Sequence, residues 1–575
     1  MQEVNEKEVN EKEVNVKKHK THVFGRFPTA KNSGEASETS REDAGNKKSR
    51  RNSLLWLGGF VLIVGIIFVW LGSMVVKVDP FFHYKAPDTE TYYYELDNAR
   101  SQNDGIVRQF DYDALILGTS MAQNFKTSEC DEIFGVNSAK SVFTGASFME
   151  VGDNLKRALE ANSNIKMVIR SLDMDFFFLD YNETGGMATG EYPTYLYDDN
   201  IFNDYQYVLN RDVIFGRVYP MIKATQAADF EPGITSFDDY GNWMNGTYTF
   251  GANTVLADED LKNYEMDTSS MSEHEKHVVK RNITRNITDI ADQYPDVTFY
   301  YYIPPYSAVW WNRQMEAQVL QRELECEQYV LELMLEHDNI RVFSYNTNTA
   351  ITTNLNHYKD LGHYGEWVNS AILEWMHDGI GEVTKDNLAE YIAEEREIYS
   401  NLDYTALKDQ EDYDDDRLVS HVLLGVHYTE EMLNEGELMK AEIVQDEESG
   451  YVGVRCVGTI DRDPVNGLSV EEHLFTEDYC GIKLTVEDLG LYSTISFKGY
   501  KTADHGMPTV VVYSEDGETE AVFNYSYAAI DEEIQVFSMD VSGVSGKAVI
   551  IFNGGYTDNI GNPDSEFTFL DICLS

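Results

Sequence analysis

Three residues in two short motifs could together perform nucleophilic chemistry on an ester. The first motif is Asp113-Ala-Leu-Ile-Leu-Gly-Thr-Ser120, in which an apolar run ends at Gly118 and places a serine hydroxyl in the following turn. A serine at the carboxyl end of a parallel strand faces the crevice where open α/β sheets bind ligands, and a helix that follows adds backbone N–H groups. Ser120 is therefore a candidate nucleophile. The alternative is that it only caps the helix.

The second motif lies about 240 residues later and contains Asp360 and His363, three positions apart at the start of the last predicted helix. This spacing lets an aspartate orient an imidazole and stabilise its charged form while the imidazole faces the nucleophile, as a Ser-His-Asp triad requires. A lone D-x-x-H is common, and it can be a helix cap with an incidental histidine. The two motifs together, in this order, favour the catalytic interpretation.

Further motifs occur in order along residues 78–380. They are Val78-Asp-Pro-Phe-Phe-His-Tyr, Gly105-Ile-Val-Arg, Ile116-Leu-Gly-Thr-Ser-Met, Gly145-Ala-Ser-Phe-Met-Glu, Tyr302-Ile-Pro-Pro-Tyr-Ser and Tyr358-Lys-Asp-Leu-Gly-His-Tyr.

With these motifs the chain resembles membrane-anchored SGNH (GDSL-like) hydrolases and acyltransferases, which are related to the alginate and peptidoglycan O-acetyltransferases and to the D-alanyl transfer protein of teichoic acid synthesis. The resemblance implies that Ser120 is the nucleophile, His363 the general base and Asp360 its partner. It also implies an oxyanion hole made of the backbone N–H groups of Ser120 and Gly145.

The chain departs from the family pattern in two places. Thr119 stands where the G-D-S block has an aspartate. The G-x-N-D block is missing, because Asp173-Met-Asp175 follows the corresponding strand and offers no asparagine to an oxyanion. The third oxyanion donor is therefore unassigned. A carboxylate near a forming oxyanion would repel it, so we interpret Asp173 and Asp175 as structural.

Other chemically suggestive residues give weaker predictions. Trp310 and Trp311 could form an aromatic wall against a sugar or an acyl chain, since flat rings bury a large area, but core packing is the alternative. His274 and His277 have a metal-like spacing on a predicted helix, without further ligands nearby in the sequence. We expect no catalytic metal and no cofactor.

Short apolar runs alternate with amphipathic segments from Asp113 onward, as in parallel strands joined by helices. This pattern predicts an α/β, doubly wound domain over residues 78–382, and the resemblance implies the three-layer SGNH type. The predicted strands are Ala114–Leu117, Lys166–Leu172, Val297–Ile303 and Ile340–Phe343. The predicted helices are Met149–Ala161, Ser272–Gln293, Arg313–His337 and Tyr364–Met376.

The remainder of the chain predicts two further regions. Residues 383–449 are acidic and helix-like, which indicates a linker. Residues 450–575 contain short alternating strands separated by Gly, Asp and Asn turns, which predict an all-β, jelly-roll-like sandwich. Its last strand, Phe567–Leu574, is weakly similar to those of carbohydrate-binding modules, and a purely structural role is the alternative.

One uncharged segment near the N-terminus is long enough to cross a bilayer. Leu54–Val76 extends about 34 Å as a helix. Lys47, Lys48, Arg50 and Arg51 precede it and only Lys77 follows closely, so we expect a single-pass signal anchor with a cytoplasmic N-terminus. A cleaved signal peptide is the alternative, but no A-x-A-like site closes the segment. Residues 1–53 predict a disordered cytoplasmic tail.

The charge balance limits the possible partners. Residues 1–53 hold 12 of the 45 Lys and Arg and 9 of the 99 Asp and Glu, which leaves 33 and 90 beyond the span, a net charge of −57. This field disfavours nucleic acid and other polyanions and favours a neutral polymer as substrate.

These observations together predict an extracellular serine esterase or O-acyltransferase that modifies a cell-surface glycan through an acyl-Ser120 intermediate. The resemblance implies a multipass membrane acyltransferase as donor partner. The competing hypothesis is a catalytically inactive SGNH-fold scaffold or glycan-binding protein.

Overall fold

The structure is a computed structural model of the chain. It describes residues 39–574 except 185–192, 246–247, 411, 413–425, 427, 435–438, 446–451, 460–479, 502–507, 515–518, 525–533 and 555–563. Most of the predicted cytoplasmic tail therefore lies outside the described residues. The chain divides into two compact units, Met1–Trp70 and Leu71–Ser575.

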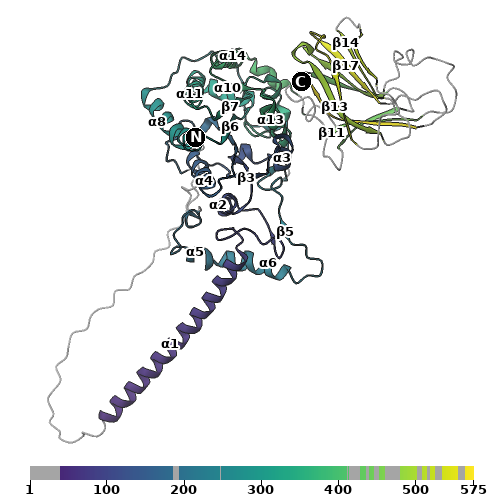
Figure 1. Cartoon of the computed structure of the whole chain (residues 1–575). Coiled ribbons are helices and arrows are strands. Elements are labelled where there is room, and N and C mark those ends of the chain that lie inside the picture. Colours follow the sequence, from purple (N-terminus) through teal and green to yellow (C-terminus); the bar gives the residue numbers. More distant parts are fainter. Residues whose placement is uncertain are drawn as a thin grey trace. The chain divides into compact units, whose positions relative to one another are not determined.

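The first described element is the long helix α1, Thr39–Val78 (Figure 1). Its part Arg51–Val78 is long and apolar enough to cross a membrane. The last turns of α1 belong to the second unit, where Val75 and Val78 are fully buried in a hydrophobic core. The apolar helix therefore ends inside the folded domain that follows it.

A six-stranded sheet forms the centre of this domain, in the order β3-β2-β4-β6-β7-β8. The first five strands run parallel, and the edge strand β8 is antiparallel to β7. Every residue of β2, β3 and β4 is buried, as expected for a parallel sheet that is covered on both faces. The strands are β2 Ala114–Gly118, β3 Ser138–Val142, β4 Met167–Ser171, β6 Thr298–Ile303, β7 Ile340–Ser344 and β8 Glu382–Val383. A small pair, β1 Tyr93–Tyr94 and β5 Gly233–Ile234, lies apart from this sheet.

Helices connect and cover these strands. Helix α2 packs with α4 beside β3, α3 with α13, and α11 with both α8 and α14. The helices are α2 Ala99–Gln109, α3 Thr127–Phe134, α4 Phe148–Ala161, α5 Tyr205–Val208, α6 Tyr219–Ala224, α7 Ala252–Val255, α8 Glu273–Ile283, α9 Asp289–Gln293, α10 Ala308–Glu316, α11 Leu320–Met334, α12 Thr349–Thr352, α13 Glu366–Asp378 and α14 Leu388–Asn401. Short helical turns are η1 Ser120–Ala122, η2 Met174–Phe176, η4 Thr194–Leu196, η5 Val213–Val218, η6 Trp243–Asn245, η7 Thr284–Thr288, η8 Leu355–His357 and η9 Tyr404–Asp409.

The four predicted strands are present, with ends that differ by one residue or less from β2, β4, β6 and β7. The prediction missed β3, whose sequence Ser-Ala-Lys-Ser-Val has few apolar residues although all five are buried. The predicted helix Arg313–His337 is in fact α10 and α11, separated by a turn in which Gln318 has a φ of +58°. A left-handed residue cannot continue a right-handed helix.

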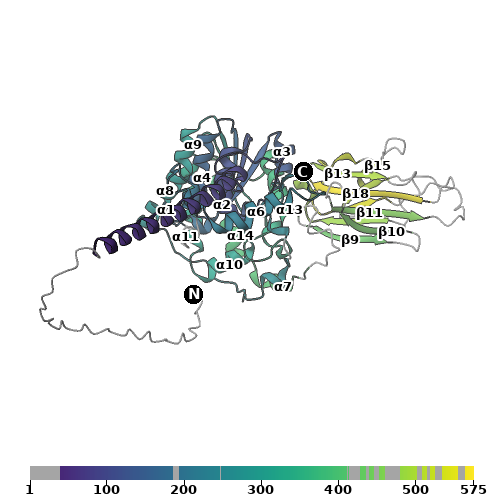
Figure 2. The same ribbon diagram turned by 90° about the horizontal axis from the view of Figure 1, so that it is seen from below.

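The C-terminal region has two five-stranded sheets with antiparallel neighbours, β10-β11-β18-β13-β16 and β15-β14-β17-β12-β9 (Figure 2). Its buried apolar residues form a core separate from that of the α/β domain. The strands are β9 Tyr428–Asn434, β10 Met439–Gln445, β11 Val452–Thr459, β12 Cys480–Val486, β13 Thr494–Lys501, β14 Thr509–Ser514, β15 Thr519–Asn524, β16 Gln535–Asp540, β17 Ala548–Asn553 and β18 Asp564–Leu574, with a short turn η11 Leu489–Leu491.

The β region begins earlier than predicted. Strands β9 and β10 lie within residues 383–449, which we expected to be a helical linker, and α14 accounts only for the first part of that range. Strand β9 is an edge strand whose Glu431 pairs with Lys483 of the neighbouring strand at 2.8 Å. Charged side chains are common on edge strands, and here they conceal the alternation by which a strand is recognised.

Candidate active site

Ser120 is positioned by a strand that ends in an obligatory glycine. Gly118, the last residue of β2, has a φ of +147°, and a Cβ atom there would lie 2.3 Å from Ser171 Oγ and 2.8 Å from Ala122 Cβ. Glycine is required both by the backbone angle and by the space. The chain then turns into η1, where the side chain of Thr119 accepts a hydrogen bond from the N–H of Met121. Ser120 is therefore the first residue of η1 and remains partly exposed.

Asp360 and His363 lie in a tight loop that precedes α13. A bridge between Tyr358 and Tyr364 closes this loop, and the N–H of Lys359 donates to the carbonyl of His363 at 3.0 Å. The hydroxyl of Tyr358 donates to the carbonyl of Pro305 at 2.8 Å, which fixes the loop to the segment after β6. The pair is thus held by a closed loop, and not by the helix that begins at Glu366.

The structure brings the two motifs together. His363 Nε2 lies 2.8 Å from Ser120 Oγ, and His363 Nδ1 lies 2.9 Å from both carboxylate oxygens of Asp360. These distances are within hydrogen-bond range. One ring nitrogen of His363 faces the serine and the other faces the aspartate. The arrangement allows the imidazole to take a proton from the serine while the carboxylate holds the other ring nitrogen.

The carboxylate of Asp360 is well stabilised as an anion. Burial alone would raise its pKa, but the hydrogen bond and charge of the His363 ring, together with the backbone N–H groups of His363 and Gly362, lower the pKa to about 2. The side chain of His363 is 31% exposed and that of Asp360 is 48% exposed, so a substrate can approach the pair from solvent.

Asp173 supports the turn that carries the nucleophile. This buried carboxylate accepts hydrogen bonds from Thr119 Oγ1 at 2.8 Å and from Ser171 Oγ at 3.2 Å. Burial raises the pKa of Asp173 to about 6, although these two donors act in the opposite direction. Its contacts give Asp173 a structural role. Asp175 accepts a hydrogen bond from the indole N–H of Trp310 at 3.3 Å.

Gly145 lies in the loop after β3, at the same edge of the sheet as Ser120. The strands β2 and β3 are parallel neighbours, with Gly118 opposite Val142. Gly145 has a φ of +61° and is exposed, and nothing lies within 4 Å of the position its Cβ would take. No residue in the described part of the chain accepts a hydrogen bond from its N–H. That N–H is therefore open to a ligand.

An aromatic group that the sequence did not reveal borders the proposed nucleophile. The indole N–H of Trp243 donates to the carbonyl of Ser120 at 3.3 Å, and its ring meets the His363 ring edge-on, with centroids 6.1 Å apart. Lys359 Nζ lies 4.0 Å from the ring centre of Trp243 and 4.1 Å from that of Tyr248. Trp243 lies on η6, in an irregular segment without a periodic pattern, so no signal in the sequence pointed to it.

The prediction of an aromatic wall at Trp310 and Trp311 is wrong. Trp311 is fully buried and stacks on Tyr399 with ring centroids 4.1 Å apart, and Trp310 is nearly buried and stacks on Tyr306. Both indoles pack in the core, because the helix that carries them is covered on that side.

Within the described residues, no three His, Cys, Asp or Glu side chains lie close enough together to hold a metal ion.

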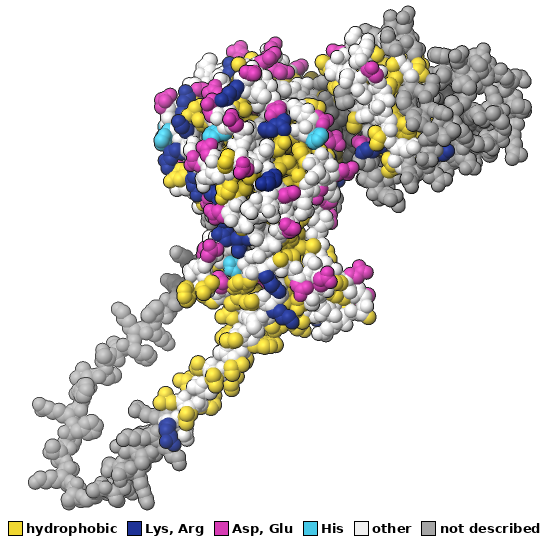
Figure 3. Space-filling model, viewed as in Figure 1, with side chains coloured by type: hydrophobic (Ala, Val, Ile, Leu, Met, Phe, Trp, Pro, Cys, Tyr) yellow, Lys and Arg dark blue, Asp and Glu magenta, His cyan; other side chains and the backbone are white. Residues whose placement is uncertain are grey.

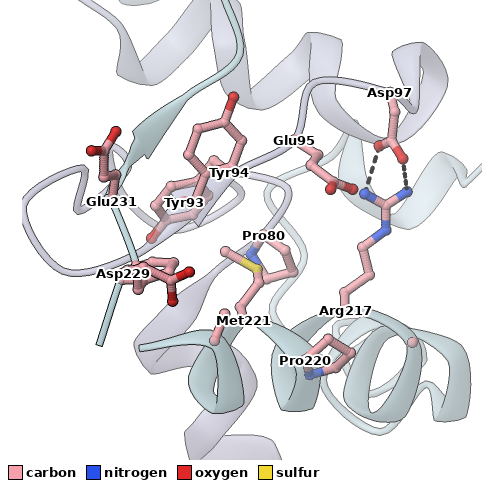
Figure 4. Close-up of a pocket in the computed structure, with 13 residues that line it drawn as sticks. Pro80, Tyr93, Tyr94, Glu95, Asp97, Arg217, Pro220, Met221, Asp229 and Glu231 are labelled. Atoms are coloured by element: carbon pink, nitrogen blue, oxygen red, sulfur yellow. Dashed lines mark hydrogen bonds and ion pairs between the residues drawn. The ribbon is translucent and has the colours of Figure 1, made fainter. Parts of the chain in front are cut away.

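The chain also contains a cavity of about 540 Å³ that none of the triad residues lines. Figure 4 shows this cavity between the segment around Tyr93 and Asp97, the helical segment around Arg217 and Pro220, and the strand near Glu231.

No protein-family model and no curated protein sequence matches the chain. Among solved structures, this chain is similar to a protein from Streptococcus pneumonia whose description names platelet activating factor, at 10% identity and a TM-score of 0.24, over 51% of this chain and 91% of the other. The chain is also similar to the family 11 carbohydrate-binding module of a Clostridium thermocellum cellulase, at 14% identity and a TM-score of 0.15, over 25% of this chain and 94% of the module. A family 6 carbohydrate-binding module gives 10% identity and a TM-score of 0.15, over 26% of this chain and 94% of the module. At these TM-scores nothing about the ligand of this chain follows.

Proposed function

We propose that this protein is a membrane-anchored serine esterase or O-acyltransferase that modifies a cell-envelope polysaccharide through an acyl-serine intermediate. The observation that carries the proposal is the hydrogen-bonded chain Ser120–His363–Asp360 at the carboxyl end of a parallel strand. The motifs that resemble those of the SGNH family also support it, because the resemblance implies these same three residues as nucleophile, base and partner.

In the proposed first step, Ser120 Oγ attacks the carbonyl carbon of an ester while His363 Nε2 takes the hydroxyl proton. The carbonyl π bond opens to an oxyanion, which would receive hydrogen bonds from the N–H groups of Ser120 and Gly145. The oxyanion then collapses and expels the alcohol, which takes the proton from His363. Ser120 now carries the acyl group.

In the second step, water or a sugar hydroxyl attacks the acyl carbon. His363 removes the proton of this second nucleophile and returns it to Ser120 as the acyl bond breaks. Attack by water gives hydrolysis, and attack by a sugar gives transfer. Asp360 stabilises the imidazolium that forms in both steps.

A glycan acceptor outside the cytoplasm follows from topology and charge. If α1 is a signal anchor oriented by the basic residues that precede it, everything after Lys77 is exported. A domain with 90 acidic and 33 basic residues repels polyanions, so a neutral polysaccharide fits better than a bare polyphosphate. A tether also concentrates the site near membrane-delivered acyl donors, such as a multipass acyltransferase.

The test is covalent labelling of the full-length protein with a fluorophosphonate, read by mass spectrometry. Wild type should label on Ser120. Neither Ser120→Ala nor His363→Ala should label at the rate of wild type. His337→Ala is the matched control, because His337 also pairs with an aspartate, Asp292, through Nδ1 at 2.6 Å. It should label like wild type, and thermal melting should show that all variants are folded.

The labelling also separates the enzyme from the scaffold alternative, which the missing asparagine block favours. Absence of labelling in wild type, together with full glycan acylation in cells that carry Ser120→Ala, would replace the enzyme with a scaffold. If labelling succeeds, adding a neutral oligosaccharide to an ester assay distinguishes transfer from hydrolysis, because an acceptor competes with water for the acyl-enzyme.

A further inference from the structure

A short segment of the α/β domain exposes an unusual number of large apolar side chains. Among the described residues between 79 and 410, nine large hydrophobic side chains are exposed, and six of them fall between residues 201 and 219. Ile201 is 73% exposed and Phe202 85%. The six, which we call the apolar platform, are Ile201, Phe202, Tyr205, Leu209, Phe215 and Tyr219. Clusters of this kind mark surfaces that contact a partner or a membrane.

The apolar platform adjoins the end of the apolar helix. A Cβ atom added to Gly72 of α1 would lie 3.7 Å from the side chain of Val208 and 3.8 Å from that of Leu209. Gly72 lies within the uncharged segment, about 6 Å before its end at Val76 at 1.5 Å per residue. Residues 208–209 therefore lie level with the last turns of the apolar helix. Figure 3 shows hydrophobic side chains, in yellow, gathered at the end of the domain that contains the last turns of α1.

The platform is attached rigidly to this end of the domain. Tyr207, between the exposed Tyr205 and Leu209, is fully buried, and its hydroxyl donates to Asp79 Oδ1 at 2.8 Å, just after the end of α1. Arg217 forms a two-point ion pair with Asp97 at 2.5 and 2.9 Å, drawn in Figure 4. A change in the orientation of the segment would break the buried Tyr207–Asp79 hydrogen bond and the exposed Arg217–Asp97 ion pair.

The charge and composition of the segment fit a membrane surface. Residues 200–224 contain three basic residues, Arg211, Arg217 and Lys223, and two acidic ones, Asp204 and Asp212. The chain after the span has almost three acidic residues for each basic one, so this segment is an exception. One acid, Asp204, is buried and accepts a hydrogen bond from the hydroxyl of Tyr84. Aromatic and basic side chains are typical of the region between lipid headgroups and acyl chains.

We propose that the apolar platform inserts into the bilayer interface beside α1, so that the domain is docked on the membrane surface and not merely tethered to it. The occupant is the lipid that surrounds the protein's own apolar helix. The inference rests on the proposed membrane anchor and does not depend on the proposed esterase activity.

The experiment is lipid photocrosslinking of the full-length protein in vesicles of phosphatidylcholine and phosphatidylglycerol. The crosslinker p-benzoylphenylalanine replaces Phe202, and adducts are identified by mass spectrometry. Val69 serves as the positive control, because it is 74% exposed within the apolar helix. Leu491 is the matched negative control, because it is an apolar residue of the β region whose exposure, 75%, is close to that of Val69.

We expect lipid adducts at positions 202 and 69, and at least tenfold fewer at position 491. Lipid adducts at 69 with none at 202, or adducts at 202 only to a second copy of the chain, would overturn the inference and leave the anchor intact. Absence of lipid at 69 as well would overturn the anchor and the inference together. Fluorophosphonate labelling of Ser120 in the same samples tests the proposed function separately.

Discussion

Replacing Asp360 by asparagine tests the proposed triad most directly, because the side chain keeps its size and loses its charge. In the folded wild-type protein the pKa of Asp360 is about 2, whereas its ordinary value is 3.8. This difference corresponds to about 2.4 kcal/mol of interaction at 1.36 kcal/mol per unit. Since 48% of the side chain is exposed, solvent screening leaves on the order of 1 kcal/mol. Loss of the charge alone would therefore slow the reaction about fivefold.

The larger effect of Asp360→Asn comes from the proton on the ring. The amide of asparagine can donate to His363 Nδ1, which then moves the ring proton to Nε2. A protonated Nε2 cannot accept the Ser120 proton, although it lies only 2.8 Å away. In a triad this change costs on the order of 10⁴ in kcat. We expect a fall of about 10³ to 10⁴ in kcat with KM almost unchanged.

The assay is steady-state hydrolysis of a small soluble ester by the full-length protein. Asp292→Asn is the control, because Asp292 contacts His337 Nδ1 at 2.6 Å in a pair that no serine among the described residues completes, and it should keep wild-type rates. A folded Asp360→Asn protein within fivefold of wild type would refute the reasoning, since charge alone would then explain the whole effect.

Four further outcomes follow from the structure. Ser120→Ala combined with His363→Ala should lose little more ester hydrolysis than either change alone, because residues that act as a unit are non-additive. Burial raises the pKa values of the neighbouring carboxyl groups of Glu327 and Glu395, so the stability that depends on their neutral forms is complete below the ordinary pKa of 4.5 and is lost as the pH rises through the raised values. Glu327→Gln should make this loss smaller in thermal melts from pH 5 to 8, because only one of the two carboxyl groups then titrates. Trp311→Ala should destabilise the α/β domain by about 3 to 5 kcal/mol in denaturant titrations, because it removes a buried stacked ring. Deleting residues 428–575 should leave soluble-ester turnover nearly intact, because the two hydrophobic cores are separate.

The strands could be predicted where burial and apolar composition coincide, as in Ala114–Leu117 and Ile340–Phe343. Strand β3 could not, because its central Lys140 is buried and its Nζ donates to the carbonyls of Gln123 and Phe125, each at 2.8 Å. A buried lysine with carbonyl partners far along the chain leaves no trace in the hydrophobic pattern. The same contacts hold the segment after Ser120 in place, so the polar composition of β3 serves the proposed site.

The residues of the candidate site differ in how far the sequence reveals them. Ser120 and His363 lie in local motifs whose chemistry is visible in a few neighbouring residues. Trp243 reaches Ser120 from 123 positions away, and this contact depends on the fold alone. Trp310 and Trp311 are the opposite case, because two adjacent indoles are conspicuous in the sequence. Only the packing around their helix decides whether they are exposed to solvent or buried in the core.

The difference between what a motif displays and what the fold brings together also applies to the asparagine block that the sequence lacks. The proteins that the chain resembles have an asparagine after the corresponding strand, whereas this chain has Asp173, whose two oxygens accept from Thr119 and Ser171. Thr119 is also the residue at which the chain departs from the G-D-S block of the proteins that it resembles. These two residues are joined in this chain, because Thr119 Oγ1 donates to Asp173 Oδ1 at 2.8 Å. In the proposed mechanism the oxyanion then depends on backbone N–H groups, and these come from the conformation of the chain at Ser120 and Gly145 and not from side chains that a sequence motif could display.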